Sequence, residues 1–354
     1  MNARPRIALV VASLEVVGGH GVQACTLLDH LREEGYPVSL VPIDPRYPRG
    51  LRWVRRLPYA RTLLTQALYH PSLGRLRAVD VVHVFAASYW SFLLAPVPAI
   101  LAARRFGKRV VVNYHSGEAD DHLGRWGRLV HPFLRLADAL VVPSAFLGRI
   151  FARHGHQARV IPNVVDLARF GYRDRRPLRP RLLSTRNLEP HYDVGNTLEA
   201  FAGVRARFPE ATLTVVGCGG QEGLLRRRFG DAPGVRFLGR VEPADMPAVY
   251  DGADIFVNSS VVDNQPLSVL EALAAGLPIV STATGDIPAL LAQGEAGCLV
   301  PERDPAALAA SITALLEDAT GALAMARRGR SSAEAFTWPR VSREWAAVYT
   351  EVAG

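Results

Sequence analysis

Apolar residues occur along the chain in short uninterrupted runs, separated by longer stretches in which apolar residues recur at helical spacing. Runs of Val, Ile and Leu without polar alternation are typical of parallel strands that are covered on both faces. Two series of such runs are present, at 6–13, 38–43, 80–86, 109–115, 139–144 and 158–163, and then at 180–186, 212–217, 235–239, 253–260, 278–282 and 297–300. Helical spacing separates them, as at 22–35, 196–208 and 266–276. The pattern predicts two α/β domains with parallel sheets.

The length of the chain, 354 residues, also favours two domains, because a single hydrophobic core rarely supports so long a chain. The second series of strands begins after the polar, proline-bearing stretch 166–180, where we place a linker. The longest uncharged stretch, 85–103, is interrupted by Pro96 and Pro98. We therefore interpret it as a buried helix after a strand rather than as a membrane span.

The start of the chain and the cysteines favour a cytoplasmic setting. The apolar run 7–12 lacks the long hydrophobic region and small-residue cleavage site of a secretory signal. The cysteines are odd in number and match no metal spacing, so we expect small buried thiols in a reducing compartment (Cys25, Cys218 and Cys298).

Positive charge is concentrated in the first half of the chain. Residues 1–167 hold 21 Lys and Arg against 11 Asp and Glu, a net charge of +10, whereas the remainder has a net charge of −2. Stretch 51–70 mixes arginines with Trp, Tyr and Leu, and it fits either a surface lying on anionic lipid, with 104–109 adding charge, or a solvated helix face. No nucleic-acid recognition motif is present, so nucleic acid is not an expected partner.

A glycine cluster follows the first predicted strand and precedes a helix. Gly18, Gly19 and Gly21 would let a phosphate approach the free amide groups at the helix start, since a Cβ would keep it away. The same cluster also fits a tight strand-to-helix turn without a ligand.

The densest group of polar residues lies at 258–288. Asp263 falls in a loop after a strand and Glu271 in the following helix, at the end of a parallel sheet where ligands bind. A carboxylate there accepts hydrogen bonds from vicinal hydroxyls, and the backbone amides of 265–268 suit a diphosphate oxygen. Two other interpretations remain open: a glycosidase acid with its nucleophile, and two solvated acids without a ligand.

Stretch 263–291, DNQPLSVLEALAAGLPIVSTATGDIPALL, resembles the signature of the family-4 glycosyltransferases, which have the GT-B fold. Further pieces match in order at 161–170, 213–220, 237–260 and 336–349. The resemblance implies an α/β chain with two Rossmann-like domains that face each other across a cleft. The N-terminal acceptor domain would cover 1–167 with a returning helix at 336–354, and the C-terminal donor domain 168–335.

The resemblance also implies roles for individual residues. Glu271 would bind the ribose of a nucleotide-sugar donor, Asp263 would contact the transferred sugar, and Arg186 would neutralise the leaving diphosphate. His115 matches the histidine near the transferred sugar and the acceptor, although a histidine at a strand end is often structural. The remaining predicted donor contacts are Gly18, Gly19, His191, Gly217, Asn264, Gln265, Pro266 and Leu267.

Some positions depart from the family pattern. Asp263 replaces a glutamate and is one methylene shorter. His191 stands where a lysine usually follows the arginine, so Arg186 would act with protonated His191 or with Arg240. Two usual glycines are replaced, by Val164 and Asp286.

The resemblance therefore predicts a retaining, metal-independent hexosyltransferase that uses a nucleoside-diphosphate sugar and needs no other cofactor. The acceptor would be a glycan or glycolipid, as in surface-polysaccharide synthesis, and the protein would be cytoplasmic or peripheral on the inner membrane face. The alternatives are a nucleotide-sugar binder without catalytic activity, a sugar-nucleotide epimerase, and a glycogen or starch synthase. The short chain and the missing lysine-glycine-glycine start disfavour the last of these.

Overall fold

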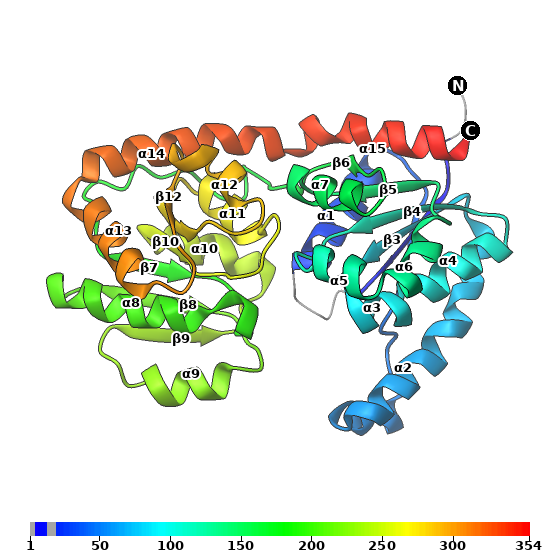
Figure 1. The fold of residues 1–354 in the computed structure, drawn as a ribbon, viewed down its shortest axis with the longest axis horizontal. Helices are drawn as coiled ribbons and strands as arrows, with labels where there is room; N and C mark the ends of the chain where they lie inside the picture. Colours follow the sequence, from blue (N-terminus) through cyan, green and yellow to red (C-terminus); the bar gives the residue numbers. More distant parts are fainter. Residues whose placement is uncertain (1–3, 13–18) are drawn as a thin grey trace. The chain divides into compact units, whose positions relative to one another are not determined.

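A computed structural model describes residues 4–12 and 19–354 of the chain, which form two units (Figure 1). Unit 1 comprises Met1–Pro162 with Val341–Gly354, and unit 2 comprises Asn163–Arg340. We propose these units as the two domains. The boundaries predicted from the sequence, 167 and 336, lie within five residues of those of the units.

Unit 1 contains a parallel sheet of six strands in the order β2-β1-β3-β4-β5-β6. Every strand coincides with a predicted apolar run: β1 Ile7–Val11, β2 Val38–Pro42, β3 Val81–Ala86, β4 Arg109–Tyr114, β5 Ala139–Val142 and β6 Arg159–Val160. All six residues of β3 are buried, as expected for a strand covered on both faces.

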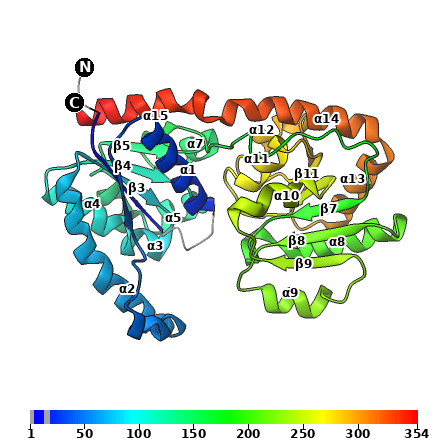
Figure 2. The same cartoon turned by 180° about the vertical axis from the view of Figure 1, so that it is seen from behind.

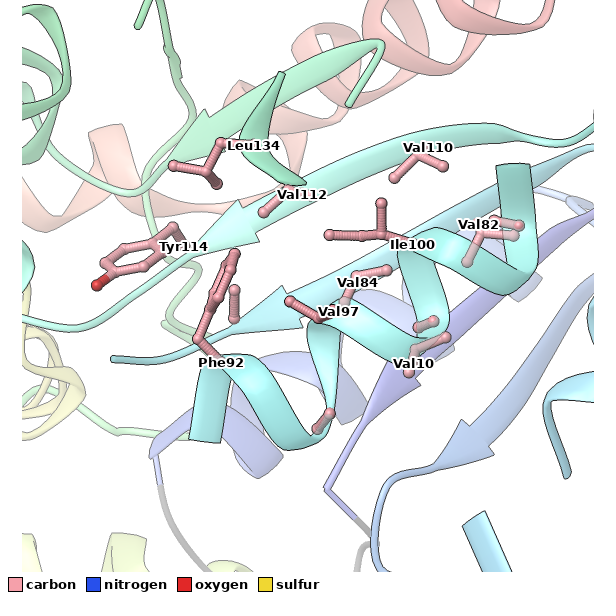
Figure 3. Close-up of a cluster of buried hydrophobic side chains, with 14 of the residues drawn as sticks. Val10, Val82, Val84, Phe92, Val97, Ile100, Val110, Val112, Tyr114 and Leu134 are labelled. Atoms are coloured by element: carbon pink, nitrogen blue, oxygen red, sulfur yellow. The ribbon is translucent and has the colours of Figure 1, made fainter. Parts of the chain in front are cut away.

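Helices cover both faces of this sheet, and one hydrophobic core lies between β3, β4 and the helices that follow them (Figure 3). Val84, Val112 and Ile100 are fully buried there. The helices of the unit are α1 Gly19–Glu33, α2 Pro58–Ser72, α3 Tyr89–Leu94, α4 Pro96–Arg105, α5 Ala119–Arg125, α6 Gly127–Leu134 and α7 Ala145–Arg153, with 3-10 segments η1 Arg49–Arg56 and η2 Leu73–Ala78.

The last helix of the chain, α15 (Trp338–Ala353), packs on unit 1, which confirms the predicted return of the C-terminus. The hydroxyl of Tyr349 lies 2.8 Å from Nδ1 of the buried His83 on β3, and the ring of Trp345 lies 5.0 Å from that imidazole. Burial lowers the pKa of His83 to about 3, so its ring is neutral and packs as part of the core.

The uncharged stretch 85–103 forms the end of β3 and the two short helices α3 and α4, not one buried helix. Pro96 begins α4, since a proline is accommodated in the first turn of a helix but not in its middle. Among residues 4–12 and 19–354, no single helix is long and apolar enough to cross a membrane. The segments Pro305–Glu317 and Ala319–Ala353 reach that length and apolar composition only when they are taken together, across a bend of 103°.

Unit 2 contains a second parallel sheet, in the order β12-β11-β10-β7-β8-β9 (Figure 2). Its strands again coincide with the predicted runs: β7 Arg181–Ser184, β8 Thr212–Val216, β9 Val235–Gly239, β10 Ile255–Asn258, β11 Ile279–Thr282 and β12 Cys298–Val300. Its helices are α8 Val194–Arg207, α9 Glu222–Phe229, α10 Met246–Asp251, α11 Leu267–Ala274, α12 Ile287–Leu290, α13 Pro305–Glu317 and α14 Ala319–Ser332, with 3-10 segments η3 Pro190–Tyr192, η4 Pro243–Asp245, η5 Ala292–Gly294 and η6 Ala333–Phe336.

Stretch 166–180, predicted to be a linker, lies within unit 2 and is held there by Arg175. The Arg175 side chain is fully buried, and it donates hydrogen bonds to backbone carbonyl oxygens (Arg173, Tyr250, Ala253, Ala275 and Gly276). Such a dense set of acceptors compensates for the desolvation of a buried cation. The segment is therefore anchored to unit 2.

Candidate active site

The predicted donor residues of unit 2 gather where the order of its strands reverses. β7 lies between β8, which follows it in the chain, and β10, which comes later. The loops after β7 and β10 leave the sheet on the two sides of this reversal, where doubly wound sheets bind ligands. Arg186 follows β7 and Asp263 follows β10, so the fold brings together two residues that are 77 positions apart.

Arg186 is the centre of this group. Its guanidinium donates to Asp263 Oδ2 at 2.6 Å and to Ser268 Oγ at 3.0 Å, and it lies 4.0 Å from the centre of the Tyr192 ring. Its side chain is only 10% exposed, and its Nε has no hydrogen-bond partner among the described residues. A buried, unpaired N–H of a permanent cation is a donor ready for an anionic oxygen.

Glu271 is held by a second, adjacent group. The hydroxyl of Tyr250 on α10 lies 2.8 Å from Glu271 Oε2 on α11 and 2.8 Å from the hydroxyl of Thr185. Burial raises the pKa of Glu271 to about 7, although the hydrogen bond from Tyr250 and the positive charges of Arg169 and Arg186 favour the ionised form. Tyr250 thus orients one oxygen of the carboxylate, and the residue as a whole is partly exposed.

Two glycines bring the loops together. Gly285 has a φ of +60°, and a Cβ there would lie 2.2 Å from the carbonyl oxygen of Asp263. Gly217, a predicted donor residue, has a φ of +131°, and a Cβ there would lie 2.3 Å from the carbonyl oxygen of Arg186. Only glycine combines this conformation with so close an approach of two backbones. Gly217 therefore supports the Arg186 loop by packing beneath it.

Gln265 joins the α11 loop to the start of unit 2. Its Oε1 accepts from the backbone N–H of Asn163 at 2.7 Å, and its carbonyl oxygen accepts from Asn163 Nδ2 at 2.9 Å. Asp286, which replaces a usual glycine, is buried, and its N–H donates to the carbonyl oxygen of Asn264 at 3.0 Å. Val164, at the other replaced glycine, is also buried.

The remaining predicted donor residues border the same loops. The carbonyl oxygen of His191 accepts from the N–H groups of Val261 and Val262, and its ring lies 4.1 Å from that of Tyr192. Pro266 directly precedes α11 and Leu267 begins it, and no side chain caps this helix end. The N–H groups of Val269 and Leu270 donate to the carbonyl oxygen of Pro266, so the first amide groups of the helix, at Leu267 and Ser268, are the ones suited to an anion.

The predicted residues of unit 1 follow a different sheet. His115 comes directly after β4, its N–H donates to the carbonyl oxygen of Ala86, and its ring stacks on Phe85 at 5.4 Å. Gly19 begins α1, whereas Gly18 lies outside the described residues.

Sequence reasoning missed Thr185 and Tyr250, and of Ser268 it predicted only the backbone amide as part of the site. Ser268 accepts from Arg186 with its hydroxyl, and its carbonyl oxygen lies 3.1 Å from the Tyr250 hydroxyl, so it lies between the two groups. A polar residue in the first turn of α11 was a visible signal for Ser268. No signal marked Tyr250, because it becomes relevant only when α10 packs beside α11.

Comparisons with known proteins identify the family of the chain. The family described as Glycosyltransferase Family 4 matches residues 17–169, and the family described as Glycosyl transferases group 1 matches residues 179–318. Glycogen synthase of Mycobacterium tuberculosis is 31% identical over 76% of this chain and 68% of its own length. Phosphatidyl-myo-inositol mannosyltransferase of Mycolicibacterium smegmatis is 28% identical over 99% of this chain and 94% of its own length.

Solved structures share the fold over almost the entire chain. Anabaena HepE, in a complex with UDP and glucose, aligns with a TM-score of 0.75 at 18% identity, covering 98% of this chain and 99% of its own. Sucrose-phosphate synthase of Thermosynechococcus elongatus aligns with a TM-score of 0.73 at 20% identity, covering 98% and 99%. Two parallel Rossmann-like sheets with a returning C-terminal helix are thus the GT-B fold that the sequence predicts. Fold and sequence together show that the chain belongs to the group 1, family 4 glycosyltransferases.

Proposed function

We propose that this protein transfers a hexose from a nucleoside-diphosphate sugar to a hydroxyl acceptor with retention of the anomeric configuration. The observation that carries the proposal is the joining of Arg186, Ser268, Tyr250 and Glu271 at the strand reversal of unit 2. The group offers a buried cation and an oriented carboxylate side by side, the two features that a diphosphate and a ribose need. Membership of a glycosyltransferase family supports this proposal over the glycosidase interpretation.

In this proposal Glu271 accepts hydrogen bonds from the ribose hydroxyls, and the diphosphate lies at the start of α11. The unpaired Nε of Arg186 then donates to a phosphate oxygen. Asp263 keeps Arg186 in place in the free protein, and each of its oxygens has capacity for a further hydrogen bond from a sugar hydroxyl. Its shorter side chain thus combines two tasks, orienting the arginine and contacting the sugar.

The reaction breaks the bond between the anomeric carbon and the diphosphate oxygen while the acceptor hydroxyl attacks from the same face. The proton of that hydroxyl passes to the departing phosphate oxygen. Arg186 and the amide groups of α11 stabilise the developing negative charge, which is electrostatic preorganisation. The proposed role of His115 is to contact the transferred sugar and the acceptor. We propose that these fixed cations and dipoles remove the need for a metal ion.

The experiment that tests the donor site is thermal melting with a panel of nucleoside diphosphates and nucleotide sugars. A ligand that binds only the folded state raises the melting temperature. We expect one nucleotide to raise it in the wild type and to lose that effect in Glu271→Ala, with Glu295→Ala, an exposed acid of the same unit, behaving as the wild type. If no nucleotide shifts the melting temperature of the wild type, the donor-site assignment is wrong. Binding without transfer to any acceptor would instead indicate a nucleotide-sugar binder.

We further propose that the acceptor is a glycan or glycolipid reached from an anionic membrane surface. Large apolar side chains are exposed along η1 and α2 and at the residue between them. We call this group the α2 patch (Leu51, Trp53, Leu57, Tyr59 and Leu63). Exposed arginines accompany them (Arg49, Arg52, Arg56 and Arg61). Both views show the N-terminal end of α2 extending away from the sheet of unit 1 (Figures 1 and 2). Apolar side chains beside cations suit the headgroup region of anionic lipid.

The second predicted basic stretch, 104–109, contributes less to such a surface. Arg104 and Arg109 both pair with Asp138, at 3.0 and 3.2 Å, so part of their charge is neutralised within the unit. The membrane proposal therefore depends on the α2 patch, and it places the protein at the inner, cytoplasmic face of the membrane.

A further inference from the structure

An aromatic cluster lies at the carboxyl ends of β3 and β4 in unit 1. The chain leaves β3 into α3 and leaves β4 into α5, and both views show these helices side by side (Figures 1 and 2). Trp90 on α3 is 65% exposed, although large apolar side chains are usually covered. Trp126 directly follows α5 and is partly exposed.

The rings of the cluster contact one another in fixed geometry. Trp90 and Trp126 meet edge to face at 5.2 Å, and Tyr89 meets Trp126 at 5.7 Å and 73°. Tyr89 has a φ of +56°, a conformation that a bulky residue rarely adopts. Its hydroxyl donates to Asp121 Oδ2 at 2.6 Å. The cluster, here called the aromatic shelf (Tyr89, Trp90 and Trp126), is thus held by a bond to α5.

A row of buried, hydrogen-bonded polar side chains packs against the shelf. The hydroxyl of Tyr114 lies 2.8 Å from Ser88 Oγ and 2.8 Å from His122 Nδ1. The imidazole of His122 is fully buried, 5.2 Å from the ring of Tyr89 and 6.3 Å from that of Trp126. Burial lowers the pKa of His122 to about 4, so this ring adds no positive charge beneath the shelf at neutral pH.

The charged groups next to the shelf are predominantly acidic. Glu118 and Asp121 both act on the Tyr89 hydroxyl and raise its pKa, together with burial, which is the larger cause. Arg125 pairs with Asp121 at 2.8 Å. Glu118 is exposed and makes no ion pair within the described part of the chain, so its carboxylate oxygens are available to accept hydrogen bonds.

We propose that the aromatic shelf with Glu118 and Asp121 forms the acceptor subsite, and that the acceptor group bound there is a neutral saccharide. The proposal rests on the proposed transferase function. A pyranose has an apolar C–H face that packs on aromatic rings, and hydroxyl groups at its edge that donate to carboxylates. A phosphorylated acceptor, in contrast, would meet the like charge of Glu118, whereas the charge of Asp121 is partly neutralised by Arg125.

The position of the shelf agrees with this assignment. The strand order of unit 1 reverses between β1 and β3, and ligands bind such sheets beyond the carboxyl ends of their strands at this reversal. Ala86 of β3 pairs with Tyr114 of β4, so the loop to Tyr89 and the predicted catalytic His115 leave the same edge of the sheet. A sugar on the shelf therefore lies at the edge that carries the histidine.

The test is direct binding of saccharides to the full chain, without turnover. We would titrate neutral glucose, mannose and galactose oligosaccharides, together with glucose 6-phosphate and myo-inositol 1-phosphate, by calorimetry, and map contacted sugar protons by saturation-transfer NMR. We expect a neutral saccharide to bind and Trp90→Ala to weaken it at least about tenfold. Glu118→Gln should weaken it less, and Leu129→Ala, an exposed apolar residue on the neighbouring α6, should leave it unchanged.

Equal affinity in Trp90→Ala and the wild type would overturn the proposal, as would binding of only the phosphorylated probes. So would the absence of any saccharide binding by protein that does bind a nucleoside diphosphate. Trp90 is largely solvent-exposed, so its replacement should preserve folding, which the melting temperature checks. Nucleotide binding is measured separately: saccharide binding without nucleotide binding would contradict the transferase proposal and leave the saccharide subsite standing.

Discussion

Tyr250 joins the two halves of the candidate donor site through a single hydroxyl group. Its O–H is placed to donate to Glu271 while accepting from Thr185, and its ring is packed by Phe170 and Phe256. The backbone carbonyl of Tyr250 accepts from the buried Arg175. Both ends of this residue are therefore fixed, so the Glu271 carboxylate has a defined orientation before any ligand arrives. We regard Tyr250 as a positioning residue.

Replacing Tyr250 by Phe should weaken nucleotide binding and change its pH dependence. The hydrogen bond from Tyr250 favours the ionised form of Glu271. Its loss should therefore raise the pKa of that carboxyl above its present value of about 7. Calorimetry at a series of pH values measures nucleotide affinity. As the pH is lowered, the affinity of the variant should begin to decline at a higher pH than that of the wild type. Tyr349→Phe, which removes a buried hydroxyl in unit 1, is the control. An unchanged pH profile in Tyr250→Phe would contradict the positioning role.

Buried His122 should make folding stability sensitive to acid. Its pKa is lowered from 6.5 to about 4 by burial, so below pH 6.5 the unfolded chain binds a proton that the folded chain does not. The contribution of His122 to the free energy of unfolding is complete above pH 6.5, and roughly 2 kcal/mol of it is lost by pH 5.

Urea unfolding at pH 7.5 and pH 5 measures this effect by comparison with His122→Gln. The free energy of unfolding of the variant should fall less between the two pH values than that of the wild type. The opposite contribution of Glu271, whose pKa is raised, is present in both proteins and cancels. Parallel pH dependence in the two proteins would show that folding does not lower the pKa of His122.

At the scale of elements, the strands could be predicted and the short helices could not. Apolar runs are typical of parallel strands, and all twelve runs coincide with β1 to β12, although the edge strands β6 and β9 contain no buried residue. The division of 85–103 into α3 and α4 depends on Pro96 and on packing against β3 and β4. Arg186 and Asp263 each follow a strand of the same parallel sheet, which brings them to one edge, although the sequence did not predict their pairing. Tyr250 required knowledge of how α10 packs.

Gly285→Ala should displace the loop between β10 and α11. The added Cβ would collide with the carbonyl of Asp263, and a φ of +60° is itself unfavourable for alanine, at a cost of about 1–3 kcal/mol. We expect a lower melting temperature and loss of stabilisation by nucleotides. Gly171→Ala in the same unit has no atom within 4 Å of the added Cβ and should resemble the wild type in both measurements. Full nucleotide stabilisation of Gly285→Ala would show that this loop does not form the donor site.

At the scale of the whole molecule, charge is divided unequally between the two halves of the chain. The net charge of +10 in residues 1–167 includes the exposed arginines beside the α2 patch. The half that would bind an anionic nucleotide has a net charge of −2. In the proposed function, nucleotide binding therefore depends on a few hydrogen-bond donors at defined positions, such as Arg186. The diffuse positive charge is free to act on a larger anionic partner.

The membrane proposal is tested with vesicles. The protein should sediment with vesicles that contain phosphatidylglycerol and not with vesicles of phosphatidylcholine alone, and added salt should reduce binding because it screens surface charge. Leu63→Glu should reduce binding, whereas Leu224→Glu, an equivalent change at an exposed leucine of α9, should not. Equal binding to both kinds of vesicle, or no effect of Leu63→Glu, would contradict the α2 patch as the contact surface.

The buried guanidinium of Arg175 determines where the chain can be divided. Its bonds reach Ala253 before β10 and Ala275 after α11, and the backbone N–H of Val165 bonds to Phe336. A donor-binding fragment that began at the first strand of unit 2, near residue 180, would lose the cation and leave these carbonyl groups without their donor. A fragment meant to keep the proposed donor site should therefore begin at Asn163, the first residue of unit 2, well before its first strand.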